Sequence, residues 1–132
     1  MPEKLLINPL SSHQNKPTIS PGVLVEGTLY ISGQIARNQD GRIVDIGDMA
    51  AQARQVFSNI ERVLSEVGSS FEDVVKITCY ISDMRYYADY SKVRSEIFPN
   101  ADIASATVVS SGFVDPDAII EIESIAVLNR NL

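Results

Sequence analysis

The chain has 132 residues, of which 45% are apolar and 21% are charged, and this composition suits one folded domain over residues 1–132. No apolar run approaches the roughly 20 residues that would span a bilayer, and no signal-peptide pattern opens the chain, so we expect a cytoplasmic protein without a membrane partner. The net charge is −6 and the basic residues are scattered. Nucleic acid is therefore not expected as a partner, because its binding requires concentrated positive charge.

Histidine and cysteine are scarce, which excludes several kinds of site. Cys79 is the only cysteine and His13 the only histidine. An intrachain disulfide and a cysteine-rich metal site are excluded, and a Ser-His-Asp triad would depend on His13, which lies among turn-forming residues. No Walker A or GxGxxG loop is present, so no nucleotide-phosphate site is predicted. Cys79 lies in an apolar segment and is expected to be a small core residue.

The beginning of the chain predicts little regular structure before two short strands. Prolines recur in residues 1–22 and oppose regular structure there. Strands are predicted at 23–26 and 29–32, on either side of a turn at Gly27-Thr28.

The clearest helix is predicted over residues 48–67. Asp48 is its expected N-cap, and Gly68 can adopt the left-handed conformation that ends it. Apolar residues recur at spacings of three and four and predict the buried face: Met49, Ala53, Val56, Phe57, Ile60, Val63, Leu64 and Val67. Polar residues are predicted on the outer face: Gln52, Gln55, Asn59, Arg62 and Glu66.

The second half of the chain predicts one capped turn, three strands and one helix. The turn is predicted at 70–73, strands at 74–82, 104–111 and 118–128, and the helix at 86–98. The element order is thus β-β-α-β-α-β-β. A mixed sheet with two helices packed on one face satisfies this order, so the predicted fold class is α+β.

The last predicted strand indicates what covers the other face of the sheet. Side chains alternate along a strand, so its two sides can be separated by sequence. One side, expected to face the helices, holds Ile120, Ile122, Ser124 and Ala126. The other side is half apolar and holds Ile119, Glu121, Glu123, Ile125 and Val127. Because the helices cannot cover both sides, this second side predicts self-association into a closed ring.

Several segments resemble the RidA/YjgF family, also described as endoribonuclease L-PSP-like. Residues 120–127, IEIESIAV, are very similar to its C-terminal IEIEAIA signature, and residues 29–35 end in its SGQI motif. Residues 50–55 and 59–60 resemble its first helix, and residues 73–78 its third strand. The matches occur in the family's order and cover roughly residues 20–128.

The resemblance implies a chorismate-mutase-like fold and a homotrimer with a central barrel, in which each interface forms a cleft for a small-molecule ligand. It also implies hydrolysis of reactive enamines and imines such as 2-aminoacrylate, with release of ammonia and without a metal or other cofactor. In the family, an arginine clamps the substrate carboxylate through two parallel hydrogen bonds and a glutamate positions water.

Carried over residue by residue, the resemblance gives an incomplete site. Glu121 matches the water-positioning glutamate and is the expected catalytic residue. Ser32 and Gly33 match the cleft-lining SGQ segment, and Thr107 matches the serine that follows the arginine. Ala106 stands where the arginine should be. No tyrosine occupies the N-terminal segment where the family has one.

The missing arginine leaves three alternatives open. The ligand lacks a carboxylate, another cation such as Arg94 or Arg85 reaches the cleft, or the site is inactive. The expected function is therefore either an enamine/imine deaminase with a non-standard substrate or a non-catalytic metabolite-binding or regulatory module of the same fold. Ribonuclease activity is the weakest expectation, because the chain is acidic and lacks a histidine pair.

Overall fold

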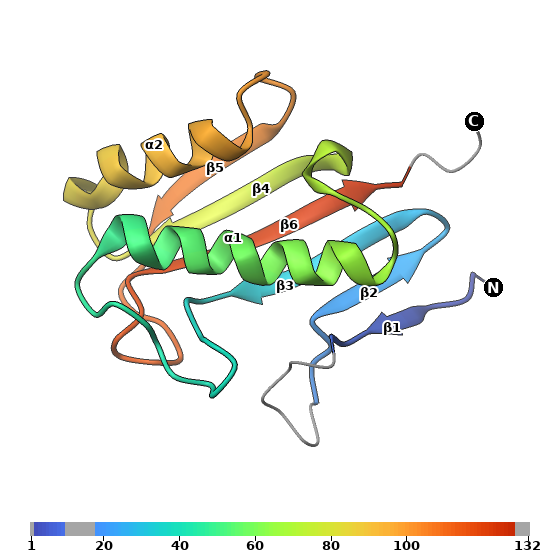
Figure 1. Cartoon of the computed structure of the whole chain (residues 1–132), viewed down its shortest axis with the longest axis horizontal. Coiled ribbons are helices and arrows are strands. Elements are labelled where there is room, and N and C mark those ends of the chain that lie inside the picture. The colour runs from blue at the N-terminus through green and yellow to red at the C-terminus, as the bar shows by residue number, and fades with distance from the viewer. Residues whose placement is uncertain (1, 10–17, 129–132) are drawn as a thin grey trace.

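The computed structural model describes residues 2–9 and 18–128, which form a mixed six-stranded sheet with two helices on one face (Figure 1). His13 lies outside the described residues. The strands are β1 (Leu5–Ile7), β2 (Gly22–Val25), β3 (Thr28–Gln34), β4 (Val74–Ile81), β5 (Ala104–Val109) and β6 (Ile120–Val127). The helices are α1 (Met49–Glu66) and α2 (Tyr87–Ile97), and single 3-10 turns occur at Phe71–Asp73 and Met84–Tyr86.

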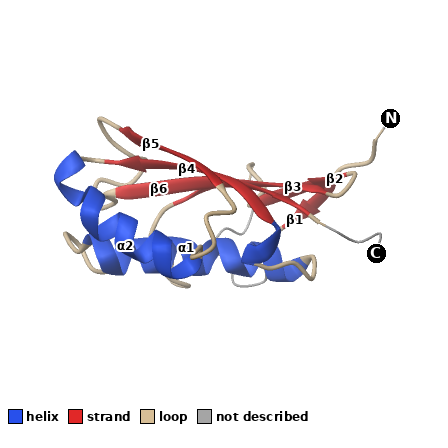
Figure 2. Ribbon diagram, turned by 90° about the horizontal axis from the view of Figure 1, so that it is seen from above, coloured by secondary structure: helices blue, strands red, loops and turns tan. Residues whose placement is uncertain are grey.

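The sheet order is β1-β2-β3-β6-β4-β5, which places the last strand of the chain near the centre of the sheet. Strands β4 and β5 are parallel, and the other neighbouring strands are antiparallel. The predicted α+β class and the order of the seven predicted elements are confirmed. Figure 2 shows that both helices cover the same face.

The prediction of irregular structure throughout residues 1–22 is wrong for one segment. Strand β1 pairs with β2 in antiparallel register, with Leu5 opposite Leu24 and Ile7 opposite Gly22. The prolines do not prevent this pairing because β1 ends before Pro9, and an edge strand needs hydrogen bonds on one side only.

Helix α1 begins and ends as its sequence predicts. The Asp48 side chain accepts a hydrogen bond from the Ala51 N–H (3.0 Å), and Gly68 has a φ of 68°. The predicted apolar positions face the core, apart from the half-buried Val67 at the C-cap. This packing fixes α1 against the helix-covered face of the sheet.

Two polar residues of α1 that the periodicity predicts on its outer face are buried instead. Gln52 donates to the Asp117 carbonyl (3.0 Å) and accepts from the Ile119 N–H (3.1 Å). Asn59 donates to the carbonyls of Ile35 (3.1 Å) and Arg37. Both side chains bond to backbone groups of loops, and their burial without such bonds would be unfavourable. They therefore attach α1 to the loops after β3 and before β6.

The two faces of the sheet differ as the alternation in the last strand predicts. On β6, Ile120, Ile122, Ser124 and Ala126 are buried beneath the helices. On the opposite face the chain leaves large apolar side chains accessible, including Tyr30, Val108 and Val127 at 50%, 44% and 47% exposure. We call this surface the open face.

Candidate functional site

A bulge in β3 creates the site. Ile31 pairs with Ser124 and Gln34 pairs with Ile122, so β3 has one more residue than β6 between these pairs. Beyond Ile31, β3 loses its pairing with β2, and the Ser32 N–H donates to the Pro21 carbonyl instead (2.9 Å). The end of β3 is therefore free to border a groove.

The Ser32 side chain is already engaged within the chain. Its hydroxyl donates to the Ser20 carbonyl (2.7 Å), and its own carbonyl accepts from the Gln34 amide (3.1 Å). These bonds fix the bulge between the N-terminal segment and β6. Ser32 thus shapes the groove, while its hydroxyl proton is engaged by the Ser20 carbonyl.

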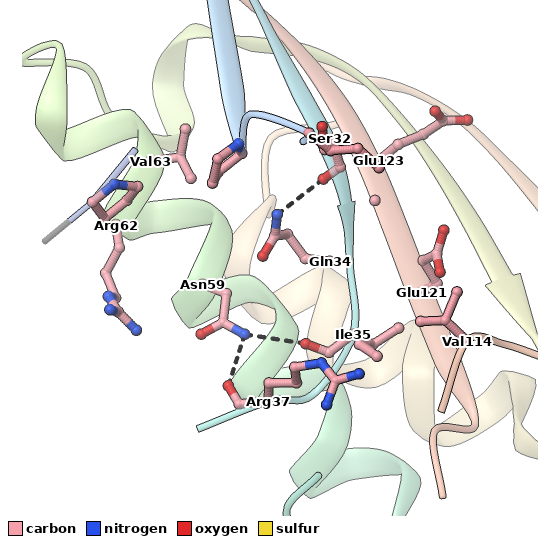
Figure 3. Close-up of a pocket in the computed structure, with 14 residues that line it drawn as sticks. Ser32, Gln34, Ile35, Arg37, Asn59, Arg62, Val63, Val114, Glu121 and Glu123 are labelled. Carbon is pink, nitrogen blue, oxygen red and sulfur yellow. Dashed lines mark hydrogen bonds between the residues drawn. The ribbon is translucent and has the colours of Figure 1, made fainter. Parts of the chain in front are cut away.

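The groove beside this bulge has a volume of about 710 Å³, within the range of small-molecule sites. Figure 3 shows it with Asn59 and Arg62 on one side of β3 and Glu121 on the other. Its lining comes from β3, α1, β6 and the adjoining loops and is mixed. The polar residues are Ser32, Gln34, Arg37, Asn59, Arg62, Glu121 and Glu123, and the others are Pro9, Ile19, Pro21, Gly33, Ile35, Val63 and Val114.

Glu121 lies directly over the backbone of Gly33. A Cβ added at Gly33 would overlap the Glu121 carboxylate and would lie 2.9 Å from its Cδ. Glycine therefore makes room for this carboxylate. Partial burial raises the pKa of the Glu121 carboxyl above its ordinary value, and the negative charge of Glu123 raises this pKa further.

The two glutamates of β6 have different surroundings. The Tyr80 hydroxyl donates to Glu123 Oε1 (2.8 Å), and this bond raises the pKa of Tyr80. Within residues 2–9 and 18–128, no hydrogen bond or ion pair engages the Glu121 carboxylate. Glu121 is consequently the carboxylate that is available to a ligand or to water.

The groove contains arginines that the sequence did not single out. Arg37 donates to the Gly41 carbonyl (2.7 Å) and pairs with Asp115 at 3.3 Å. This pair ties the β5–β6 loop to the groove, where Val114 remains 86% exposed. Arg62 also lines the groove, although helical periodicity alone places it on the outer face of α1. The one sequence feature that could have identified a groove arginine is the position of Arg37 just after the SGQI segment.

The expected cleft residues do not meet at one place within a chain. Ser32, Gly33 and Glu121 lie together, whereas Arg94 and Thr107 line a second cleft beside α2. Ala106 lines neither of these clefts: it pairs with Thr78, which pairs in turn with Glu123, so it shares the open face with that glutamate. Arg94 is therefore separated by the sheet from the position that the family's arginine would occupy.

Metal-ligating clusters and membrane-spanning helices are both absent from the part of the chain that the structure describes. Within residues 2–9 and 18–128, no three histidine, cysteine or acidic side chains gather closely enough to hold a metal ion. No helix in the same ranges is long and apolar enough to cross a membrane. Cys79 is fully buried, and this burial raises the pKa of its thiol to about 12, in keeping with the predicted core role.

Comparison with known proteins supports the family that the motifs resemble. The model of the family described as endoribonuclease L-PSP matches residues 14–128. The chain is 30% identical to a protein of unknown function from Yersinia pestis that belongs to the conserved Rid family; the match covers 96% of this chain and 100% of that one, with a TM-score of 0.88. The chain is also 25% identical to yeast Mmf1; this match covers 96% of this chain and 100% of that one, with a TM-score of 0.88.

The matched region includes both the Ser32–Gly33 bulge and the strand that carries Glu121. The two solved relatives also share the arrangement of the sheet and helices over their full length. The chain therefore belongs to the RidA/YjgF family, whose family model is described as endoribonuclease L-PSP.

Proposed function

We propose that the chain forms a RidA-like homotrimer in the cytoplasm, whose clefts between subunits bind small metabolites and hydrolyse a non-standard enamine or imine. The observation that carries this proposal is the Glu121 carboxylate, which lies over bare Gly33 backbone, partly buried and without a hydrogen-bond partner among the described residues. Such a carboxylate can accept a proton from water and direct its oxygen toward a bound ligand.

The chemistry requires one water and no redox step. An enamine first becomes the imine by gaining a proton at carbon and losing one from nitrogen. Water, oriented by Glu121, adds to the imine carbon while its proton passes through the carboxylate to nitrogen. The hydroxyl proton of this adduct then passes to nitrogen as the carbon–nitrogen bond breaks, leaving a carbonyl compound and ammonia. Glu121 must be ionised to begin this sequence. Because its pKa is raised, activity should begin at a higher pH than it would with a glutamate of ordinary pKa.

The trimer is supported by two accessible surfaces. The open face exposes Tyr30, Val108 and Val127, and β5 is an edge strand that is accessible on nearly its whole length. An uncovered apolar edge strand invites pairing with another chain. Association of three copies through the open face would bury these side chains and would enclose the side of the groove on which Glu121 lies.

The substrate is proposed to differ from 2-aminoacrylate because Ala106 supplies no cation. Within the groove, Arg37 is already paired with Asp115, and Arg62 lies across β3 from Glu121. Loss of a buried bidentate clamp typically weakens binding by roughly 2–5 kcal/mol. An imine that depends less on its carboxylate for binding fits the groove better.

Ammonia release tests this function. Imines would be generated in situ from several amino acids, including those that give 2-aminoacrylate and 2-iminobutanoate, and from neutral amines. We expect acceleration for at least one imine other than 2-aminoacrylate, and its loss in Glu121→Gln. Glu61→Gln, an exposed change on α1, is the matched control. No acceleration over buffer for any imine would overturn the catalytic proposal.

A second candidate is a metabolite-binding or regulatory module without catalysis. The observation that favours it is the missing arginine at Ala106, together with a Ser32 hydroxyl that is already bonded to Ser20. In that case a metabolite would raise the melting temperature of the protein and remain chemically unchanged after incubation.

A further inference from the structure

A second cleft lies on the helix-covered side of β5. It has a volume of about 880 Å³ and is bounded by α2, by the loop that follows α2 and by β5. Its lining comprises Met84, Tyr87, Arg94, Ser95, Phe98, Pro99, Ala101, Ile103, Ser105 and Thr107. The Glu121 groove shares none of these residues, so the two depressions are separate within one chain.

Among the described residues that line this cleft, Arg94 alone carries a charge. One guanidinium nitrogen donates to the Ser91 hydroxyl (2.9 Å), and another lies 3.5 Å from the Tyr87 hydroxyl. Among residues 2–9 and 18–128, no carboxylate pairs with Arg94. Since a guanidinium has five N–H donors, several remain for a ligand.

Two tyrosine rings hold the Arg94 guanidinium in place. Its central carbon lies 5.3 Å from the Tyr90 ring centroid and 5.8 Å from that of Tyr87, both within cation–π range. Tyr90 is completely buried and thus held by its packing, and its hydroxyl has no hydrogen-bond partner among the described residues. The positive charge is therefore oriented in advance, which reduces the entropy lost on binding.

Two hydroxyls lie on the opposite wall of the cleft. Ser105 pairs with Ile77 and Thr107 with Cys79, and both partners are buried beneath the helices. Because side chains alternate along a strand, this register places Ser105 and Thr107 on the side of β5 that α2 covers. They face the cleft as additional donors to an oxygen of a ligand.

The remaining wall is apolar. Met84, Phe98, Pro99 and Ile103 line it, so a ligand would leave its anionic group at Arg94 and pack its carbon skeleton here. A single guanidinium balances one negative charge. A phosphate dianion would meet an unbalanced charge in a chain whose net charge is −6.

We propose that the cleft between α2 and β5 binds a small monocarboxylate with an apolar body, through a clamp formed by Arg94 and supported by the Thr107 and Tyr87 hydroxyls. This site lies outside the Glu121 groove and does not depend on the reaction proposed there.

Phenylacetate is the probe and phenylacetamide its neutral counterpart of similar shape. Calorimetry and backbone-amide NMR on the full chain would measure binding. We expect saturable binding of phenylacetate, shifts centred on β5 and α2, and affinity at least about tenfold weaker for phenylacetamide, which is roughly 1.4 kcal/mol. Arg94→Gln should weaken phenylacetate binding by a similar factor.

Arg85→Gln is the matched control. Arg85 stacks on Tyr86 at 5.1 Å, close in sequence, but it does not line the cleft. Because Arg94→Gln also removes packing against two tyrosines, Thr107→Val serves as a second variant that changes one hydroxyl and little volume. It should weaken binding without altering the melting temperature of the free protein appreciably.

Equal affinity for phenylacetate and phenylacetamide would overturn the proposal, as would unchanged binding in both Arg94→Gln and Thr107→Val. Shifts centred on Gly33 and Glu121 would also overturn it, by placing the carboxylate in the other groove. Glu121→Gln should leave phenylacetate binding intact. A failed ammonia assay would remove the proposed catalysis and leave this result unaffected.

Discussion

The Glu121 carboxylate and the Gly33 backbone occupy adjoining space that leaves no room for a Cβ. A carboxylate held against a strand bulge, partly shielded from water and without a donor among the described residues, is in an unfavourable environment for its charge. Stability alone does not explain such an arrangement. Desolvated carboxylates with raised pKa values are concentrated at functional sites.

Gly33→Ala should move Glu121 and thereby report on its role. The new methyl group requires a shift of the carboxylate or of the bulge, and overpacking typically destabilises by about 1–3 kcal/mol. Urea unfolding would measure the loss of stability, and the rate of ammonia release should fall as well. Gly112→Ala is the control, since nothing lies within 4 Å of the place that a Cβ would occupy there. Unchanged stability and activity in Gly33→Ala would contradict the close packing described above.

Titration of Glu121 should show a raised pKa in the folded protein. Because the folded state holds this proton more tightly than the unfolded state, stability falls as the pH rises from the unfolded pKa through the folded pKa. Glu121→Gln removes that penalty. The variant should gain melting temperature relative to the parent at pH 7, and the gain should shrink below about pH 4, where both states of the parent bind the proton. Carboxyl NMR would give the pKa directly, and an ordinary value would contradict the prediction.

Much of the fold follows from periodicity, and most of the site does not. The spacing of apolar residues locates α1, and the alternation in β6 separates a helix-covered face from an open one. The sequence pattern wrongly predicts Gln52 on the outer face of α1, because a polar side chain usually faces solvent. In the structure Gln52 is buried and bonds to backbone groups of a loop distant in sequence. Local patterns do not contain that information.

Motifs assign the site residues, but they do not show which side of the sheet a neighbouring element covers. Glu121, Ser32 and Gly33 lie together because β3 and β6 are adjacent strands. Arg94 is one of the two cations that could replace the missing arginine in that cleft, but it lies on α2 and lines the other cleft. The parallel register of β4 and β5 turns Ala106 to the opposite, open face, and the sequence does not determine that register.

Gln52→Leu should destabilise the fold although it adds apolar surface. The change leaves the Asp117 carbonyl and the Ile119 N–H without their partner, and an unsatisfied buried group typically destabilises by about 1–3 kcal/mol. Chemical unfolding would measure it, with exposed Ser58→Ala on the same helix as the control. Amide hydrogen exchange at Ile119 should accelerate in Gln52→Leu. A stability equal to that of the parent would show that the loop finds other partners.

The Arg37–Asp115 pair should have a small coupling free energy but should restrict the motion of the loop that carries Val114. Both side chains are about one-quarter exposed, at 26% and 23%, so a double-mutant cycle with Arg37→Gln and Asp115→Asn should give a coupling of about 1 kcal/mol or less. Backbone NMR relaxation at Val114 should report greater mobility in either single variant. Additive effects together with an unchanged Val114 would mean that the pair does not anchor the loop.

Val127→Asp should disrupt the proposed assembly without unfolding the chain. Val127 lies on the open face of β6 and is 47% exposed, so in a single chain the charge would remain in water. Buried between copies, the same charge would be strongly unfavourable. Sedimentation equilibrium should give the mass of a trimer for the parent and the mass of a monomer for the variant. The circular dichroism spectra of the two proteins should be similar. Ile46→Asp, at a 69% exposed position in the loop before α1, should remain trimeric. A monomeric parent at micromolar concentration would refute the assembly itself, because no interface would then enclose the Glu121 groove.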